Sequence, residues 1–320
     1  MQNDRHYNVA RVVVGESNRE VRQATKSVLL DHGFRRIFDT CALSDIRECV
    51  SFNLADLIIC DADMTGCGFC ETVRAVRERN VGDNPFVLVL ALTSDPTDES
   101  IKRLVNCGAD DIMLKPLKPG ALLRRIEHMI GGRQPFVVTH CYIGPDRRTT
   151  PRPDDRNPLP RIEVPNPLRS RVLGEMTARQ LQEAIDKSWT VVNEHRMERH
   201  SVQIQWLLER IMPALRTDTV TSETVEHLDR LLFVAQDLSL RLKGTRFDHV
   251  GGLAVTLVDV IRRIQKSPCD ADPRAIGLLP RVADAITAAL SREHMVVDAS
   301  RRITETVSRY TTEQRPAFDA

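Results

Sequence analysis

Residues 9–130 alternate five short apolar segments with five amphipathic ones, and few folds accommodate that order. The apolar segments are rich in Val, Ile, Leu and Phe and are bounded by turn residues or charges, which is typical of buried strands. They lie at Val9–Val14, Phe34–Phe38, Ala55–Cys60, Phe86–Leu92 and Asp111–Leu114. Apolar residues recur every three or four positions, as in helices, at Arg19–Asp31, Leu43–Ser51, Glu71–Arg79, Asp98–Asn106 and Gly120–Ile130. Five such units predict an α/β fold with a doubly wound, five-stranded parallel sheet covered on both faces.

The remaining residues predict a second unit, because 320 residues exceed what one hydrophobic core usually holds. We expect the first domain to span 1–132. Residues 133–174 are dense in Pro and Arg, which disfavours helix and sheet interior and predicts a semi-rigid linker. Residues 175–312 show almost only helical periodicity and predict an antiparallel all-α bundle, followed by a flexible tail at 313–320.

Helix boundaries within this second unit follow from local signals. Pro213 is expected to end the first helix, and Ser222 is expected to cap the next one. The helices are expected at Met176–Met212, Thr224–Leu242, Leu253–Ile264, Ala275–Leu290 and Met295–Tyr310.

Composition argues against several classes of protein. The formal net charge is +1, which provides no basic field for nucleic acid. The longest apolar run, Phe86–Leu92, is far shorter than the roughly 20 residues that span a bilayer, and the first residues carry no signal-peptide pattern. The eight cysteines then read as reduced thiols in a cytoplasmic protein that contacts neither DNA nor membrane.

Four polar residues stand at the ends of the expected strands. Glu16 follows the first strand, Asp61 the third, Thr93 the fourth and Lys115 the fifth. The carboxyl ends of parallel strands share one edge of a sheet, so these residues can converge on a single anionic or metal-assisted centre. The simpler alternative is that each is a solvated residue or part of a turn, as most isolated acids and lysines are.

With these residues in this order, the segment resembles the CheY-like receiver domain of two-component response regulators. The resemblance implies a flavodoxin-like fold, Asp61 as the phosphoacceptor, and Mg²⁺ held by Glu16, Asp61 and Asp63. It implies that Thr93 and Lys115 bind the phosphoryl group. An aspartate attacks phosphorus poorly unless cations neutralise the developing charge, and Mg²⁺ with Lys115 would do so. The implied phosphoryl donor is a histidine kinase or a phosphotransfer protein.

The chain departs from the receiver pattern at several positions. Gly15 replaces the first of two adjacent acids, which is expected to weaken Mg²⁺ binding without necessarily abolishing it. Thr65 replaces a proline, Phe69 a glycine, and Ile112 the aromatic residue of the fifth strand. These departures keep a second interpretation open, in which the segment is a pseudo-receiver that docks partners without phosphorylation.

Cys67-Gly68-Phe69-Cys70 offers a third interpretation. A CxxC motif at a helix N-terminus can lower a thiol pKa and support redox chemistry. Its position after the third strand does not suit a thioredoxin fold, and no second cysteine or histidine pair completes a zinc site. Packing is therefore the favoured role, with a redox sensor as the alternative.

The GPDRR sequence at 144–148 resembles a linker found behind receivers in alphaproteobacterial regulators. Its arginines can bind phosphate, or they can be solvated or pair with Asp146, Asp154 and Asp155, which we favour. The helical part faintly resembles a histidine phosphotransfer bundle, but Leu240 or Gln236 stands where the phosphoacceptor histidine belongs. His227, His249 and His294 are read as ordinary histidines.

We therefore expect a response regulator that accepts a phosphoryl group at Asp61 and has a helical, non-enzymatic output. The helical part is expected to contact an unidentified downstream protein, and both a monomer and a homodimer remain open. No helix-turn-helix with a basic recognition helix is evident in 175–312, which disfavours DNA binding. The alternative is a scaffold that docks signalling partners independently of phosphorylation.

Overall fold

The structure is a computed structural model of the chain, and it describes residues 5–64, 68–148, 159–217 and 219–291. Contacts divide the chain into two units, Met1–Val192 and Asn193–Ala320. This division falls later than the boundary at residue 174 that composition suggests, because residues just after 174 pack on the first unit. Leu181 and Ile185 share a buried cluster with Phe86 and Phe136.

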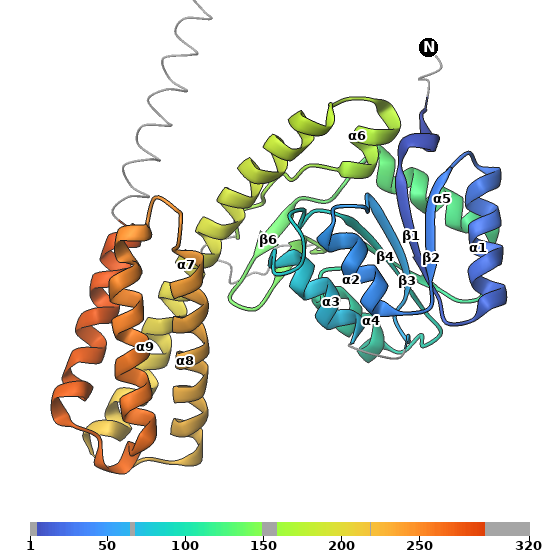
Figure 1. Ribbon diagram of the computed structural model, residues 1–320. Coiled ribbons are helices and arrows are strands. Elements are labelled where there is room, and N and C mark those ends of the chain that lie inside the picture. Colours follow the sequence, from blue (N-terminus) through green and yellow to red (C-terminus); the bar gives the residue numbers. More distant parts are fainter. Residues whose placement is uncertain (1–4, 65–67, 149–158, 218, 292–320) are drawn as a thin grey trace, which may run out of the picture. The chain divides into compact units, whose positions relative to one another are not determined.

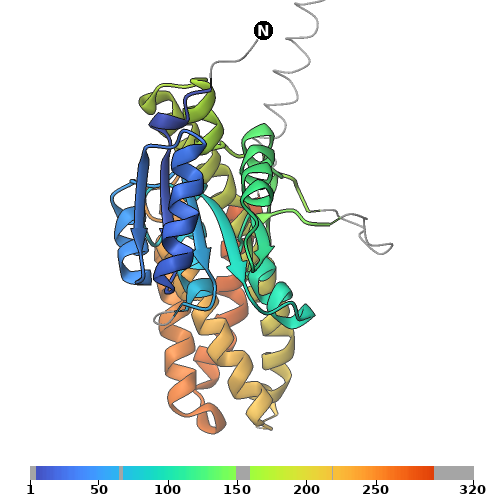
Figure 2. The same ribbon diagram turned by 90° about the vertical axis from the view of Figure 1, so that its right-hand side faces the viewer.

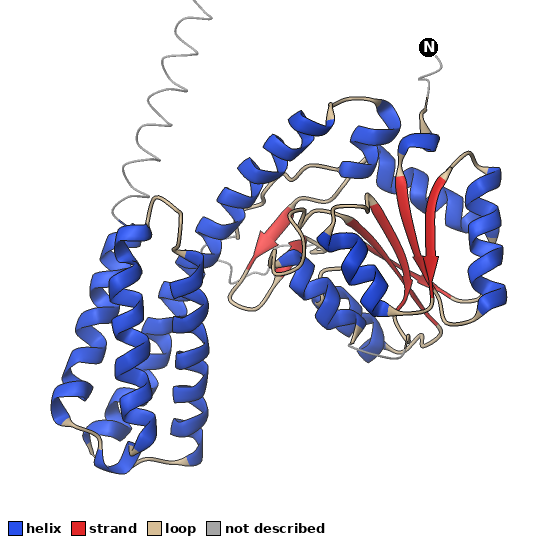
Figure 3. Ribbon diagram, viewed as in Figure 1, coloured by secondary structure: helices blue, strands red, loops and turns tan. Residues whose placement is uncertain are grey.

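The first unit contains a five-stranded parallel sheet with strand order β2-β1-β3-β4-β5, as the sequence predicts (Figure 3). The strands are β1 (Arg11–Gly15), β2 (Arg36–Thr40), β3 (Leu57–Asp61), β4 (Leu88–Thr93) and β5 (Asp111–Leu114). The helices between and after them are α1 (Arg19–Asp31), α2 (Leu43–Ser51), α3 (Phe69–Arg77), α4 (Asp98–Asn106) and α5 (Pro119–Gly131). The strand order reverses between β1 and β3, and in open α/β sheets ligands bind at such a reversal, beyond the carboxyl ends of the strands.

Alternation along the strands assigns each helix to a face of this sheet. Val12 and Val14 of β1 belong to a core that α1 and α5 cover, whereas Val13 between them belongs to a core with α2, α3 and α4. Successive strand residues point to opposite faces, so burial on both sides requires a continuous apolar run. Figures 1 and 2, drawn at right angles to each other, show helices on both faces of the sheet.

Four of the five expected strands, all but the last, begin two residues later than their apolar runs. Tyr7–Val9 forms a 3-10 turn ahead of β1, and Phe34 precedes β2. Phe34 is fully buried, and its ring centroid lies 5.2 Å from that of Tyr7. These residues close the core beside the sheet, so apolar character there reflects packing and not strand pairing.

The expectation that 133–174 is a linker without helix is wrong for the described residues, which also form a two-stranded sheet. Strands β6 (Phe136–Val138) and β7 (Ile143–Pro145) pair antiparallel, and Pro167–Leu173 forms helix α6. Proline fits both places, since Pro145 ends its strand and Pro167 stands in the first helical turn, where no amide hydrogen bond is needed. Residues 149–158, which include Asp154 and Asp155, lie outside the described residues.

The GPDRR sequence is part of this hairpin and docks on the first unit. Arg147 donates a 2.6 Å hydrogen bond to the carbonyl oxygen of Ala109. The Asp146 carboxylate accepts hydrogen bonds from the Arg148 amide at 3.1 Å and from the Arg161 side chain at 2.9 Å. The Arg147 side chain thus bonds a backbone carbonyl, and the arginine side chain that pairs with Asp146 is that of Arg161, outside the motif. Pairing of the motif's own arginine side chains with Asp146 stays a prediction.

A buried carboxylate, Asp110, links the hairpin to the sheet. It accepts a hydrogen bond from Arg77 at 2.6 Å on one oxygen, and from Arg133 at 2.9 Å on the other. The side chains of Arg77, Asp110 and Arg133 are 1%, 6% and 5% exposed. Phe136 of β6 contacts both guanidinium groups, whose carbons lie 5.4 Å and 4.6 Å from its ring centroid. Removing the carboxylate would leave two buried cations without their shared anion.

We expect Asp110→Ala to lower the free energy of unfolding of the first unit by about 3–5 kcal/mol, because it breaks a buried ion cluster. Urea unfolding can be followed by fluorescence of Trp189, in a Trp206→Phe background in which no other tryptophan remains. Asp83→Ala removes an exposed acid and is the matched control, with an expected change within about 0.5 kcal/mol. Equal effects of the two substitutions would contradict a stabilising role for the Asp110 cluster.

The second unit is helical, as expected (Figure 1). It contains the later part of α7 (Ala178–Arg216), α8 (Ser222–Arg241), α9 (Gly251–Lys266) and a helix over 273–291. Their apolar faces share one core that includes Leu207, Leu231 and Ile261. The expected helix at Met295–Tyr310 and the tail at 313–320 lie outside the described residues.

Two helix boundaries in this unit differ from the sequence predictions. Pro213 lies inside α7, which continues to Arg216 because the Pro213 carbonyl accepts hydrogen bonds from both the amide and the hydroxyl of Thr217. Thr221, and not Ser222, caps α8 in a reciprocal arrangement with Thr224. None of the helices among the described residues combines the length and apolar character needed to span a bilayer.

Candidate functional site

The structure brings Glu16, Asp61 and Lys115 together at the carboxyl edge of the sheet. The Lys115 ammonium nitrogen lies 2.6 Å from Glu16 Oε2 and 2.8 Å from Asp61 Oδ2. Glu16 and Asp61 are 3% and 6% exposed, whereas the Lys115 side chain is 17% exposed. One ammonium group therefore bridges two nearly buried carboxylates, so the site combines an acid pair with its own cation.

Backbone groups fix the second oxygen of each carboxylate. Glu16 Oε1 accepts a 2.9 Å hydrogen bond from the amide of Asn18, whose side chain in turn caps α1. Asp61 Oδ1 accepts a 3.2 Å hydrogen bond from the amide of Asp63. The turns that follow β1 and β3 thus orient both acids before any ligand is present.

Thr93 is fully buried at the end of β4, next to this acid pair in the sheet order. Its hydroxyl oxygen accepts a 3.1 Å hydrogen bond from the Asp95 amide, which leaves the hydroxyl proton available as a donor. Its carbonyl accepts the Lys115 amide at 2.9 Å and so holds the start of the Lys115 loop. Asp63 Oδ2 accepts a 3.4 Å hydrogen bond from the Ser94 amide and ties together the loops after β3 and β4.

Burial and ion pairing act in opposite directions on Lys115. Burial alone would lower its pKa, but hydrogen bonds and charges from Asp61 and Glu16 outweigh burial and raise the pKa above its ordinary value of 10.5. The lysine therefore stays charged at neutral pH. A constitutively charged ammonium is suited to binding an anion beside Asp61.

We expect carbon-13 NMR of the Lys115 Cε to titrate above pH 10.5, and Asp61→Asn to lower that midpoint. The pKa of Lys115 is higher in the folded protein than in the unfolded chain. The stability that its ion pairs contribute is therefore complete below the unfolded pKa and is lost as pH rises through the folded pKa. The free energy of unfolding of Lys115→Met, measured with urea, should not show this decrease at alkaline pH. A midpoint that Asp61→Asn leaves unchanged would show that Asp61 does not hold the ammonium.

Gly15, the position of the missing acid, is crowded by the side chains around it. A Cβ atom there would lie 2.5 Å from Ile46 Cδ1, 2.9 Å from Cys60 Sγ and 3.2 Å from Met64 Sδ. All three neighbours are buried. The surrounding core has thus closed over the place that a first acid would occupy, and restoring an acid there would require repacking.

Two carboxylates, Glu16 and Asp61, remain in position to hold a cation. Carboxylate oxygens suit Mg²⁺, which keeps several waters and often takes only one or two protein carboxylates. Among the residues that the structure describes, no group of three or more His, Cys, Asp or Glu side chains is arranged to hold a metal ion. Glu16 and Asp61, which Lys115 bridges, are two carboxylates of the kind that Mg²⁺ takes, and the role of Asp63 as a third ligand stays a prediction.

We expect Gly15→Ala to lower the free energy of unfolding by about 1–3 kcal/mol, because the new methyl group overpacks the core. Ile46→Val removes the closest contacting atom and should recover part of this loss in the double variant. The double-mutant cycle, followed by Trp189 fluorescence in the Trp206→Phe background, measures the coupling. Strictly additive effects would mean that Ile46 does not occupy the space next to Gly15.

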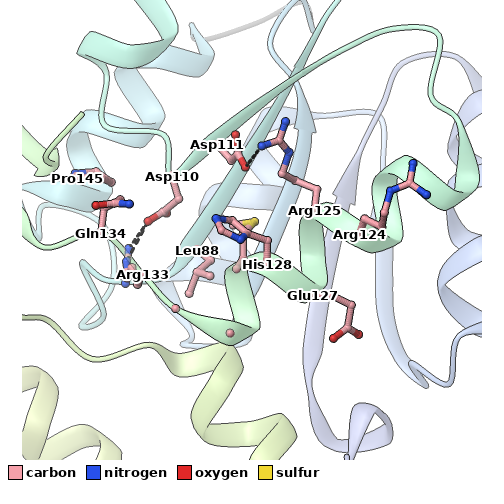
Figure 4. A pocket seen from close by; sticks show the side chains of 13 residues that line it. Leu88, Asp110, Asp111, Arg124, Arg125, Glu127, His128, Arg133, Gln134 and Pro145 are labelled. Atoms are coloured by element: carbon pink, nitrogen blue, oxygen red, sulfur yellow. Dashed lines mark hydrogen bonds and ion pairs between the residues drawn. The ribbon is translucent and has the colours of Figure 1, made fainter. Parts of the chain in front are cut away.

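A pocket of about 800 Å³ with a mixed polar and apolar lining lies at the opposite, amino-terminal edge of the sheet (Figure 4). Leu88 and Asp111, which begin β4 and β5, contribute to its lining, with Arg125 and His128 from α5. Arg125 lies 3.2 Å from Asp111, and Asp110 is held by Arg133. These carboxylates balance neighbouring guanidinium groups, so the pocket wall is built from structural ion pairs.

The second unit holds a buried polar cluster that sequence reasoning missed. His200 is fully buried, and its Nε2 lies 2.6 Å from Asp237 Oδ2, which also accepts a 2.7 Å hydrogen bond from Arg241. The signal was available, because His200 follows the apolar residue Met197 and precedes Ile204 at helical spacing. Its burial keeps the imidazole from a phosphoryl donor on the surface.

Comparisons with known proteins match residues within the first unit. A family model of the response regulator receiver domain matches residues 12–127. Chemotaxis protein CheY4 of Vibrio cholerae is 24% identical over 38% of this chain and 98% of its own, with a TM-score of 0.34. An orphan response regulator of H. pylori is 24% identical over 38% and 96%, with a TM-score of 0.33. No curated protein matches the chain.

Proposed function

Residues 12–127 belong to the response regulator receiver family, and on that premise we propose that Asp61 accepts a phosphoryl group from a phosphohistidine protein. The donor would be a cytoplasmic histidine kinase or phosphotransfer protein. An Asp61 oxygen would form the new bond to phosphorus while the bond from phosphorus to the donor imidazole breaks, leaving an acyl phosphate and a free imidazole. The observation that supports this most is the bridge from Lys115 to Asp61 at the sheet edge.

The chain's own residues have distinct tasks in this step. Lys115 carries the positive charge that offsets the negative charge of the transferred group, and its raised pKa keeps that charge in place. Thr93 can donate its hydroxyl proton to a phosphoryl oxygen while its own oxygen stays bonded to the Asp95 amide. Glu16 and Asp61 are the carboxylates that would hold Mg²⁺, which when bound neutralises phosphoryl charge.

An apolar groove beside Lys115 supports docking of a protein donor. Its volume is about 460 Å³, and Val21 and Val28 of α1 line it together with Leu117 and Leu122. Lys115 itself contributes to the lining. A helix of a donor protein seated on this groove would contact α1 and the loop after β5, next to the phosphoacceptor.

We also propose that the helical unit transmits the signal through protein contacts and is not itself an enzyme. Phe233 and Leu240 are 65% and 63% exposed. They stand seven residues apart on α8, so they lie on the same helix face. Exposed apolar side chains of this size on one face favour an interface with a downstream protein or a second copy of the chain.

Incubation of the full chain with acetyl phosphate and Mg²⁺, followed by intact mass, tests phosphorylation. We expect the mass of one phosphoryl group to be gained, lost again with hydroxylamine, and absent from Asp61→Asn. Chelation of Mg²⁺ with EDTA should abolish the gain. Asp83→Asn, at an exposed position, is the matched control and should be phosphorylated like the unchanged chain.

The crowding at Gly15 favours a second candidate function, in which the receiver docks partners without turning over phosphate. In that case the unchanged chain gains no mass under the same conditions. Phosphorylation that persists in Asp61→Asn would instead overturn the assignment of the acceptor. The two failures are distinguishable, because the first leaves every variant unmodified and the second leaves every variant modified.

A further inference from the structure

The proposed function leaves the CxxC motif and the buried cluster around His200 without a role. The motif begins at Cys67, which lies outside the described residues, so its redox interpretation stays a prediction. The cluster lies in the second unit, where it joins α7 to α8.

The contact between the two helices uses one ring nitrogen of a buried histidine. His200 of α7 is fully buried, and its Nε2 lies 2.6 Å from Oδ2 of Asp237 on α8. An ionised carboxylate only accepts hydrogen bonds, so Nε2 carries the proton of this contact. The other ring nitrogen, Nδ1, is buried and has no hydrogen-bond partner among the described residues. The neutral imidazole therefore supplies everything that this contact requires.

Two guanidinium groups share the same carboxylate. Arg241 Nε donates a 2.7 Å hydrogen bond to Asp237 Oδ2, and Arg196 Nε lies 3.9 Å from that oxygen. Their side chains are 6% and 3% exposed. The Asp237 carboxylate thus already faces two buried cations while His200 is neutral. A protonated His200 would add a third positive charge beside them.

The charged groups around His200 come from the two helices that it joins. Arg196 stands one turn earlier on α7, and Asp237 and Arg241 stand one turn apart on α8, whereas α9 and the helix over 273–291 supply apolar residues to the neighbouring core. Burial lowers the pKa of His200 below its ordinary value of 6.5, against the opposing hydrogen bond to Asp237. Burial raises the pKa of Asp237, but the bond from His200 and the charge of Arg241 outweigh it and lower that pKa, so the acid stays ionised.

We propose that this cluster is a pH-sensitive switch, which holds α7 against α8 while His200 is neutral and loosens that contact when His200 takes up a proton. The proton would bind Nδ1, since Nε2 already carries one. The new N–H group would be a buried donor without an acceptor, and the new charge would face Arg196 and Arg241. Both costs are relieved when the two helices separate enough to admit water.

Acidification is the direction that opens this switch. The pKa of His200 is lower in the folded unit than in the unfolded chain. The stability that neutral His200 contributes is therefore complete above the unfolded pKa and is lost as pH falls through the folded pKa. The inference does not depend on phosphorylation of Asp61, because the cluster lies outside residues 12–127.

Carbon-13 NMR of the histidine rings in the full chain measures the protonation of His200 directly. His200→Gln assigns the signal, because that signal disappears from the spectrum of the variant. We expect a titration midpoint below 6.5. A midpoint at or above 6.5 would overturn the proposal, because the folded unit would then favour the charged imidazole.

Hydrogen exchange followed by mass spectrometry tests the opening of the helices in the full chain. We expect the amides of 193–204 and 234–241, corrected for their intrinsic exchange rates, to exchange faster at about pH 5.5 than at about pH 7.5. The increase should reach at most about tenfold, because the lower pH is about one unit below 6.5. Absence of this increase in the unchanged chain would contradict the switch, and that result needs no variant that folds.

Two variants assign the opening to one histidine. His200→Gln keeps an amide donor for Asp237 but takes up no proton in this range, so its corrected exchange should not rise on acidification. His249→Gln, at an exposed position of the same unit, is the matched control and should respond as the unchanged chain does. An equal rise in both variants would show that another group opens the helices, and the assignment to His200 would be wrong.

Discussion

Two carboxylates buried side by side at one edge of a sheet require a shared cation, and Lys115 provides it. Without the ammonium group, Glu16 and Asp61 would repel each other in a site from which water is largely excluded. The parallel sheet makes this meeting unavoidable, because β1, β3 and β5 all end at the same edge. The turns after β1 and β3 then orient each carboxylate through a backbone amide. The order of the strands thus determines which charged residues meet at the sheet edge and must neutralise each other.

The loss of an acid at position 15 is a change in packing as much as a change in charge. Ile46, Cys60 and Met64 fill the volume beside Gly15, and they belong to the core that α2, α3 and α4 share with the sheet. A metal site that has lost one carboxylate by simple substitution would keep an empty, polar space there. Here the neighbouring side chains are apolar and close, so the site depends on Glu16, Asp61 and Lys115 as its charged groups. The apolar packing around Gly15 and the reduced set of charged groups therefore distinguish this chain from the receiver pattern more clearly than the single residue difference does.

The sequence predicted the sheet and the meeting of Glu16, Asp61 and Lys115, because apolar runs and the rule for strand ends are local and topological signals. It misjudged features that depend on tertiary contacts. The many prolines in 133–174 argued against regular structure there. The hairpin forms because Arg77 and Arg133 around Asp110 stabilise it, and not because of its own strand propensity. Residues that satisfy a buried partner across a long sequence separation leave no periodic pattern.

The docking of β6 and β7 also determines how much of the chain makes up an autonomous receiver. The family match ends at residue 127, before both strands of the hairpin. A chain cut at residue 132 would lose Arg133 and Phe136, and Asp110 and Arg77 would be left facing water beside the start of β5. The smallest self-sufficient piece of this protein therefore has to include the hairpin. For this receiver, the segment that looks like a spacer is part of the folding unit.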